Sequence, residues 1–164
     1  NPPVSIIGNF PYNISSQILF KIFENKEIIY EMIGMFQYEV AERICEHEGS
    51  KKYGIISVIT QAYYKTSLLF EVSNNLFTPP PKVNSAVISL KRKKNINLNC
   101  DEKLFLKIVK LSFQQRRKTI RNSLKQINLS DNLREDIIFD KRPEQLSVNE
   151  FIDLTNLVSH DLNN

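Results

Sequence analysis

A short segment, Asn9-Phe10-Pro11-Tyr12, contains groups that can act on a nucleobase. The exocyclic amine of adenine is a poor nucleophile because its lone pair is delocalised into the ring. An amide oxygen on Asn9 and a backbone carbonyl at Phe10 or Pro11 can accept hydrogen bonds from that amine, which favours a pyramidal nitrogen able to attack a methyl sulfonium. Proline fixes the backbone, and Tyr12 offers a flat face for stacking. A plain turn is the alternative, since Asn and Pro are turn formers.

A second candidate segment runs from Phe77 to Ser85 and holds three consecutive prolines between an aromatic residue and a cation. Such a run keeps a loop rigid at low entropic cost. If the loop folds over the same strand edge, Phe77 can cover the other face of a base stacked on Tyr12, and we assign Lys82 to RNA contact. A spacer between strands, or a PxxP-type ligand, is the alternative.

Residues 103–125 carry eight basic side chains and no acidic one, whereas residues 126–164 carry three basic and eight acidic side chains. On one helix Arg117, Arg121 and Lys125 would share a face with Lys118 beside them, which suits a track of phosphates. Arg116 falls on the same line as apolar residues, so we expect its charge to be paired or snorkelling. A solvated helix face is the alternative.

The elements that must position these residues follow from the apolar pattern. Val4–Gly8 is short, continuous and rich in β-branched residues, which predicts a strand buried on both faces of a parallel sheet, with Asn9 at its carboxyl end where open α/β sheets bind ligands. Ser15 or Ser16 can cap the next helix. Further elements are expected over 32–37 (strand), 39–46 and 55–64 (helices), and 64–73 and 85–93 (strands joined by a loop). This order indicates the second half of an α/β sheet.

The C-terminal part reads differently. Residues 94–100 are polar and Asn-rich, which marks a linker, and the pattern beyond them is purely helical. We expect one domain over residues 1–94 and a small all-α domain over residues 101–164. Since the chain lacks an initiator Met and opens almost directly on a buried strand, we also expect upstream sequence to be missing.

Composition limits the cellular setting. The net charge is +4 and 41% of residues are hydrophobic, which suits a globular protein. Cys45 and Cys100 match no disulfide framework or metal-ligand spacing, so we expect a reducing cytosol and no metal. No apolar stretch approaches the ~20 residues that span a membrane, and no secretion signal is recognisable. We therefore expect a cytoplasmic protein without a membrane partner, and a monomer.

Five motifs in register closely resemble the ribosomal small-subunit adenine dimethyltransferases over essentially the whole chain. They are Asn9–Ser15, Gln37 with Glu39-Val40 and Arg43, Tyr53-Gly54, Phe77–Val83 with Ser85, and Gln115–Leu124. The resemblance implies the C-terminal half of a Rossmann-like S-adenosylmethionine methyltransferase sheet followed by a small all-α domain that docks on ribosomal RNA.

The resemblance also implies an activity, the dimethylation of N6 on two adjacent adenosines near the 3′ end of small-subunit (16S) rRNA. Asn9 and Phe10 would contact the S-adenosylmethionine cofactor, and Asn9, Pro11, Tyr12 and Phe77 would handle the base. The implied partners are small-subunit ribosomal RNA and the immature small ribosomal subunit. Related macrolide-resistance methyltransferases share the N-x-P-Y signature, but the Arg116–Thr119 run favours the ribosomal branch.

Three departures from the family pattern bear on these expectations. Phe10 stands where Leu or Ile is usual, and Tyr38 stands where a basic residue is common, which puts one phosphate contact in doubt. The family's G-x-G-x-G loop and the acidic residue after it do not lie in residues 1–164, so we expect this chain alone not to bind the cofactor tightly. A non-catalytic RNA-binding or ribosome-assembly module, and a DNA adenine-N6 methyltransferase, are the alternative functions.

Overall fold

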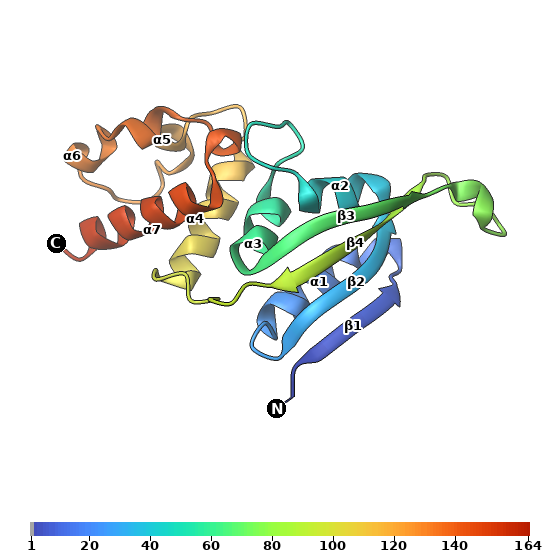
Figure 1. The fold of residues 1–164 in the computed structure, drawn as a ribbon. Helices are drawn as coiled ribbons and strands as arrows, with labels where there is room; N and C mark the ends of the chain where they lie inside the picture. Colours follow the sequence, from blue (N-terminus) through green and yellow to red (C-terminus); the bar gives the residue numbers. More distant parts are fainter. Residues whose placement is uncertain (1) are drawn as a thin grey trace. The chain divides into compact units, whose positions relative to one another are not determined.

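The computed structural model of the chain describes residues 2–164, which form two compact units (Figure 1). Unit 1 holds the residues up to Glu46 together with Thr60–Ile96, and unit 2 holds His47–Ile59 together with Asn97–Asn164. The domains expected from the sequence were 1–94 and 101–164, so residues 47–59 were assigned to the first one. In the structure these residues group with the C-terminal helices. Helix α3 (Ile55–Tyr63) contributes its first residues to unit 2 and its last to unit 1.

Unit 1 is built on a four-stranded sheet in the order β1-β2-β4-β3. The strands are β1 (Val4–Asn9), β2 (Ile29–Gln37), β3 (Tyr64–Val72) and β4 (Ser85–Arg92). β1 and β2 run parallel to each other. β4 is antiparallel to both of its neighbours, β2 and β3, so β3 runs in the same direction as β1 and β2. The four segments expected to be strands are all strands, although β2 begins three residues before the predicted start at Met32.

The core of unit 1 lies between the sheet and the helices α1 (Ser15–Glu24) and α2 (Tyr38–Cys45) on one of its faces (Figure 1). Alternate residues of β2 and β4 point into it, which is the period-2 pattern of a sheet covered on one side. Tyr64 is fully buried, and its hydroxyl donates to the Ile29 carbonyl at 3.0 Å. The largest fully buried side chains of this core are Tyr64, Phe36, Leu19, Ile22, Met32, Ile44 and Ile88.

Strand β1 departs from the expectation of burial on both faces. Among the described strands it pairs only with β2, at one edge of the sheet. Ile7 is 83% exposed and Val4 is 41% exposed, so the strand is not buried on both faces. The parallel pairing itself is confirmed, with Gly8 opposite Gly34 and Asn9 opposite Met35.

The start of α1 also differs from the prediction. A 3-10 turn, η1 (Tyr12–Ile14), precedes the helix, and Ile14 occupies the N-cap position without a side-chain cap. Ser15 is the first helical residue, and its hydroxyl donates back to the Tyr12 carbonyl at 3.1 Å. The hydroxyl therefore tightens the turn instead of accepting from a free helical N–H, because η1 already continues into the helix.

Unit 2 is helical, as the apolar stripes predicted. Its main helices are α4 (Glu102–Gln114) and α7 (Val148–Leu162), which contact each other. Their fully buried apolar residues include Phe105, Ile108, Phe151, Leu154 and Val158. Shorter elements between them are α5 (Ile120–Ser123), α6 (Asp131–Arg134), η3 (Ile137–Asp140) and η4 (Pro143–Gln145). No described helix of the chain is long and apolar enough to cross a membrane.

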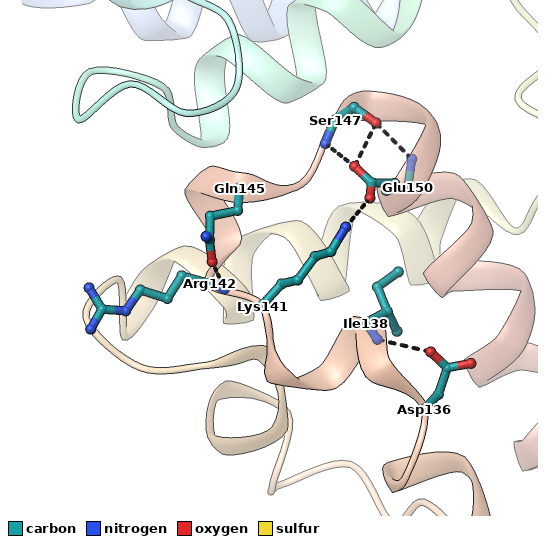
Figure 2. Close-up of polar contacts among 7 residues, drawn as sticks. All are labelled: Asp136, Ile138, Lys141, Arg142, Gln145, Ser147 and Glu150. Carbon is teal, nitrogen blue, oxygen red and sulfur yellow. Dashed lines mark hydrogen bonds and ion pairs between the residues drawn. The ribbon is translucent and has the colours of Figure 1, made fainter.

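Side-chain caps set the turns that lead into α7 (Figure 2). Ser147 accepts from the Glu150 backbone N–H, and the Glu150 carboxylate accepts from the Ser147 backbone N–H at 2.8 Å, which is a capping box. Lys141 pairs with the same carboxylate at 2.6 Å. The hydrogen bond from Lys141, with that from the Ser147 backbone, holds the pKa of Glu150 below its ordinary value.

Candidate functional site

A cavity of about 400 Å³ lies in unit 1 at the carboxyl ends of the parallel strands β1 and β2. It brings together five residues that the sequence singled out, namely Asn9, Phe10, Pro11, Tyr12 and Phe77, with Thr78, Pro79 and Pro81 completing its lining. The sheet topology explains the meeting of two segments that are distant in sequence. β4 runs antiparallel to β2, with Ser85 opposite Gln37, so the loop before β4 lies at the end of the sheet where β1 stops.

Asn9 is the last residue of β1 and is exposed to this cavity. The Phe10 N–H donates to the Met35 carbonyl at 3.3 Å, so the hydrogen bonding between β1 and β2 continues one residue past Asn9. This hydrogen bond fixes the backbone on the C-terminal side of Asn9. No described residue forms a hydrogen bond with the Asn9 side-chain amide. Its oxygen and its nitrogen can therefore both serve a ligand.

The two backbone carbonyls that follow Asn9 are not equivalent. The Pro11 carbonyl accepts from the Ile14 N–H at 3.2 Å and from the Ser15 hydroxyl at 3.5 Å. Among the described residues, none donates to the Phe10 carbonyl. Sequence reasoning left Phe10 and Pro11 open as acceptors, and the geometry favours the carbonyl of Phe10.

The Phe10 side chain lies over the sheet. Its ring centroid is 5.3 Å from that of Phe36. A Cβ atom placed on Gly34 would lie 2.4 Å from this ring, and one placed on Gly8 would lie 3.0 Å from it. The paired glycines therefore leave the space that the ring occupies, and packing of the ring anchors the backbone next to Asn9.

Tyr12 is half-buried, and its hydroxyl oxygen lies 2.5 Å from the hydroxyl oxygen of Ser85. Ser85 is fully buried as the first residue of β4. This hydrogen bond joins the motif after β1 to the end of the proline-rich loop and restricts rotation of the Tyr12 ring. Sequence reasoning placed Ser85 in a motif but assigned it no role, because nothing local links it to Tyr12.

Asparagine side chains close the proline-rich loop. Proline has no N–H to donate, so the loop cannot close on backbone hydrogen bonds alone. The Asn84 amide oxygen accepts from the Asn74 N–H at 3.0 Å, and its nitrogen donates to Glu71 at 2.7 Å. The Asn74 side chain donates to the Pro81 carbonyl at 3.1 Å. These bonds hold Phe77 at the cavity, while Lys82 is exposed and does not line it.

The basic segment of unit 2 does not form the single helix that was expected. α4 ends at Gln114, residues 115–118 form a turn, and α5 covers only Ile120–Ser123. Thr119, in extended conformation, separates the two helices. Arg117, Arg121 and Lys125 are therefore not on one helical face, because tertiary contacts of the turn override the local helical periodicity.

Arg116 is one source of these contacts. Its guanidinium donates to the Tyr53 carbonyl at 2.9 Å and to the carbonyls of Ser50 and Lys51. The expectation that this charge is engaged inside the protein is confirmed. Its partners are three carbonyls of the 50–53 segment, which belongs to the same compact unit.

The other basic side chains differ from one another. Arg121 pairs with Asp140 at 2.6 Å, an acidic partner from outside residues 103–125. Its partner comes from the acidic segment that follows the basic one. Arg117, Lys118 and Lys125 are exposed and form no ion pair with any described residue.

No group of three or more His, Cys, Asp or Glu side chains that could hold a metal ion occurs within residues 2–164. Cys45 and Cys100 are free thiols. Desolvation by burial raises the pKa of the Cys45 thiol to about 11, which leaves it a poor nucleophile at neutral pH. The residues that line the cavity supply amide, carbonyl, phenol, hydroxyl and aromatic groups.

Comparisons with known proteins agree on one family. A family model described as ribosomal RNA adenine dimethylase matches residues 1–159. Ribosomal RNA small subunit methyltransferase A of Flavobacterium johnsoniae is 64% identical over 161 residues, which are 98% of this chain and 62% of that protein. The Bacteroides thetaiotaomicron protein of the same name is 59% identical over 161 residues, 98% of this chain and 60% of its own length. The chain thus spans about three fifths of the length of these relatives.

Two solved structures share the fold. A dimethyladenosine transferase from Plasmodium falciparum has a TM-score of 0.86 at 22% sequence identity and covers 98% of this chain and 69% of its own. The 23S rRNA methyltransferase ErmE has a TM-score of 0.61 at 22% identity, covering 94% of this chain and 66% of its own. The expected fold, a Rossmann-like methyltransferase sheet followed by helices, is confirmed.

Proposed function

Because this chain belongs to the ribosomal RNA adenine dimethylase family, we propose that it carries the base-handling site of an S-adenosylmethionine-dependent enzyme that dimethylates N6 of two adjacent adenosines near the 3′ end of small-subunit rRNA. The observation that carries this proposal is the cavity at the end of β1. It unites a free amide at Asn9, a free carbonyl at Phe10 and two aromatic residues from separate segments.

In this proposal Asn9 and Phe10 orient the target amine. The two N–H groups of adenine N6 donate hydrogen bonds to the Asn9 amide oxygen and to the Phe10 carbonyl, which favours a pyramidal nitrogen whose lone pair is less delocalised into the ring. When bound, S-adenosylmethionine supplies an electrophilic methyl group on a sulfonium. The new C–N bond would form as the methyl C–S bond breaks and leaves a neutral thioether, and the methylated nitrogen would then lose one proton to water. After the first transfer one N–H remains, so one acceptor suffices for the second.

Tyr12 and Phe77 hold the extruded base in the proposed site. Stacking on an aromatic side chain contributes roughly 1–3 kcal/mol per base. The hydrogen bond to Ser85 keeps the Tyr12 ring in one orientation, and the asparagine bonds of the proline-rich loop keep Phe77 opposite the motif. Pro11 contributes through its fixed backbone and through the turn that its carbonyl closes.

The cofactor is proposed to contact Asn9 and the backbone of Phe10. The site fits one edge of such a ligand because it lies at the carboxyl end of a parallel strand and its amide is free to donate as well as accept. The glycine-rich loop that would hold the rest of the cofactor is absent from residues 1–164. We therefore expect these residues alone to bind the cofactor weakly.

Docking on the RNA is assigned to exposed cations outside the cavity. Lys82, Arg117, Lys118 and Lys125 have no ion pair within the described chain, so each can meet a phosphate. Arg121 would contribute less because Asp140 already neutralises it. The proposed partner is small-subunit rRNA in the immature subunit, with the protein acting as a monomer in the cytoplasm where that substrate is found.

Methyl transfer to unmodified small ribosomal subunits tests this function. The protein in its full natural length should transfer labelled methyl groups to N6 of adenosine, and Asn9→Ala should abolish transfer while RNA binding stays unchanged. Asn13→Ala is the matched control, since Asn13 is exposed four residues away and does not line the cavity. RNA binding without any transfer by the wild type would instead favour a non-catalytic module, and transfer to DNA alone would favour a DNA methyltransferase.

A further inference from the structure

Four lysines gather at the end of the unit 1 sheet opposite the cavity. Lys91 lies on β4 directly across from Lys65 on β3, and Lys93 and Lys94 follow β4 without an intervening acidic residue. Lys65, Lys91 and Lys94 are exposed and Lys93 is half-buried. We name Lys65, Lys91, Lys93 and Lys94 the β3–β4 lysine cluster.

Among the described residues, none forms an ion pair with the ammonium groups of the cluster. Glu31 lies opposite Lys91 on β2, but no ion pair joins them, and the Glu27 carboxylate pairs with no lysine of the cluster. Lys91 instead lies over the Tyr30 ring, with its ammonium 5.9 Å from the centroid. Arg92, between the cluster members, is occupied by the carbonyls of Lys26 and Glu27. The remaining positive charge of the cluster faces solvent.

Lys65 and Lys91 lie directly opposite each other on β3 and β4, while Glu31 on β2 lies on the other side of Lys91. Like charges directly opposite on neighbouring strands repel each other. Burial, and then the nearby charge of Lys65, lowers the pKa of Lys93. An anion bound between them would relieve the repulsion.

Protection of an open sheet edge does not account for the cluster. Lysines on an edge strand prevent unwanted strand pairing, and Lys65 on β3 could act in that way. Lys91 lies on β4, however, which pairs on both sides with β2 and β3. Its exposed ammonium protects no edge.

The position of the cluster points to an extended anion. β4 runs from Ser85 at the cavity to Lys91 at the cluster, which at about 3.3 Å per residue separates the two by roughly 20 Å. A single small anion could occupy the cluster but would not connect it with the cavity. A nucleic-acid backbone presents phosphates at regular intervals over such a length.

We propose that the β3–β4 lysine cluster is a second RNA-contact surface, which binds backbone phosphates of the substrate RNA about 20 Å from the target base. This inference rests on the proposed function for the identity of the RNA. It assigns the cluster to binding of structured RNA and not to the methyl-transfer step.

The test measures RNA binding and methyl transfer separately, using the protein in its full natural length. The variant is Lys65→Gln with Lys91→Gln and Lys93→Gln, and the probe is a transcript of the 3′ part of small-subunit rRNA. The charge-matched control is Lys21→Gln with Lys51→Gln and Lys103→Gln, three exposed lysines scattered over the chain. The variant should bind the transcript about tenfold more weakly at low salt. The magnitude of the slope of log K against log salt concentration should fall by about 2 to 3.

Methyl transfer at saturating RNA should stay unchanged in the variant. Equal affinity and equal slope in the variant and the control would overturn the proposal, as would a variant that loses binding to vesicles of phosphatidylserine but not to RNA. Wild-type protein that binds the transcript but transfers no methyl group would refute the proposed function. The RNA affinities of the variant and the control would still test the role of the β3–β4 lysine cluster. Wild-type protein that binds no RNA would refute both.

Discussion

The phenol oxygen of Tyr12 lies 2.5 Å from the hydroxyl oxygen of Ser85, and this hydrogen bond joins two residues 73 positions apart in the chain. It couples the turn after β1 to the first residue of β4, so the two walls of the cavity share one fixed point. The aromatic face that we assign to the base is therefore oriented by a serine that does not line the cavity.

Ser85→Ala should lower kcat for methyl transfer about tenfold, because a misplaced stacking ring shifts the base from its reactive position. Loss of the hydrogen bond should also cost about 0.5–1.5 kcal/mol of unfolding free energy. Tyr12→Phe should act similarly, and the double variant should be no worse than either single one in a double-mutant cycle. Ser89→Ala on the same strand serves as control, and additive effects of the two substitutions would show that the bond does not orient the ring.

Gly34→Ala should destabilise the protein by about 1–3 kcal/mol, because the new methyl group would overlap both the Phe10 ring and the Met32 sulfur and overpack the site. Methyl transfer should fall as well, since the ring anchors the backbone beside Asn9. Adding Phe10→Leu should restore part of both losses by removing the overlap with the ring. Thermal unfolding checks this, with Gly54→Ala as control because a Cβ there meets nothing closer than 4.0 Å. A failure of Phe10→Leu to rescue would place the strain elsewhere.

Arg117→Gln with Lys118→Gln should weaken RNA binding and reduce its salt slope by about 2, one for each lost phosphate contact. Arg121→Gln should change the slope less, since Asp140 already neutralises that guanidinium. Fluorescence anisotropy over a salt series measures both. Arg142→Gln, an exposed cation of the same unit, is the reference, and a larger effect from Arg121 than from the pair would contradict the assignment.

Glu150 should make stability depend on pH in the acid range. Its pKa is held below the ordinary value of 4.5, chiefly by Lys141 and then by the Ser147 backbone, so the ionised form favours the folded chain. This stabilisation is fully present above the unfolded pKa and is lost as the pH falls through the folded pKa. Glu150→Gln should lower the unfolding temperature near neutral pH and flatten its decline on acidification. Asp153→Asn on the same helix is the comparison, and an equally steep decline in Glu150→Gln would exclude this group as the cause.

Much of unit 1 follows from local pattern. The apolar run after residue 3 and the alternation in 85–93 predicted strands that the structure contains, and the N-x-P-Y segment and proline run identified five residues that line one cavity. These predictions succeed because strand period, turn chemistry and side-chain type are properties of neighbouring residues. The choice between the carbonyls of Phe10 and Pro11 was not available locally, since it depends on a turn that consumes one of them.

What only the tertiary structure decided concerns pairs that are remote in sequence. The helical periodicity of residues 114–125 predicted one basic helix, but the carbonyls of the 50–53 segment hold Arg116 in a turn, and Asp140 takes the charge of Arg121. Local sequence also does not predict the partners of three further positions. These are the hydrogen bond of Ser85, the ring beside Gly34 and the pairing of Lys65 with Lys91. Residue types and local periods are written in the sequence, whereas the register of strands and the partners of charges are set by which packing buries the most apolar surface without leaving polar groups unpaired.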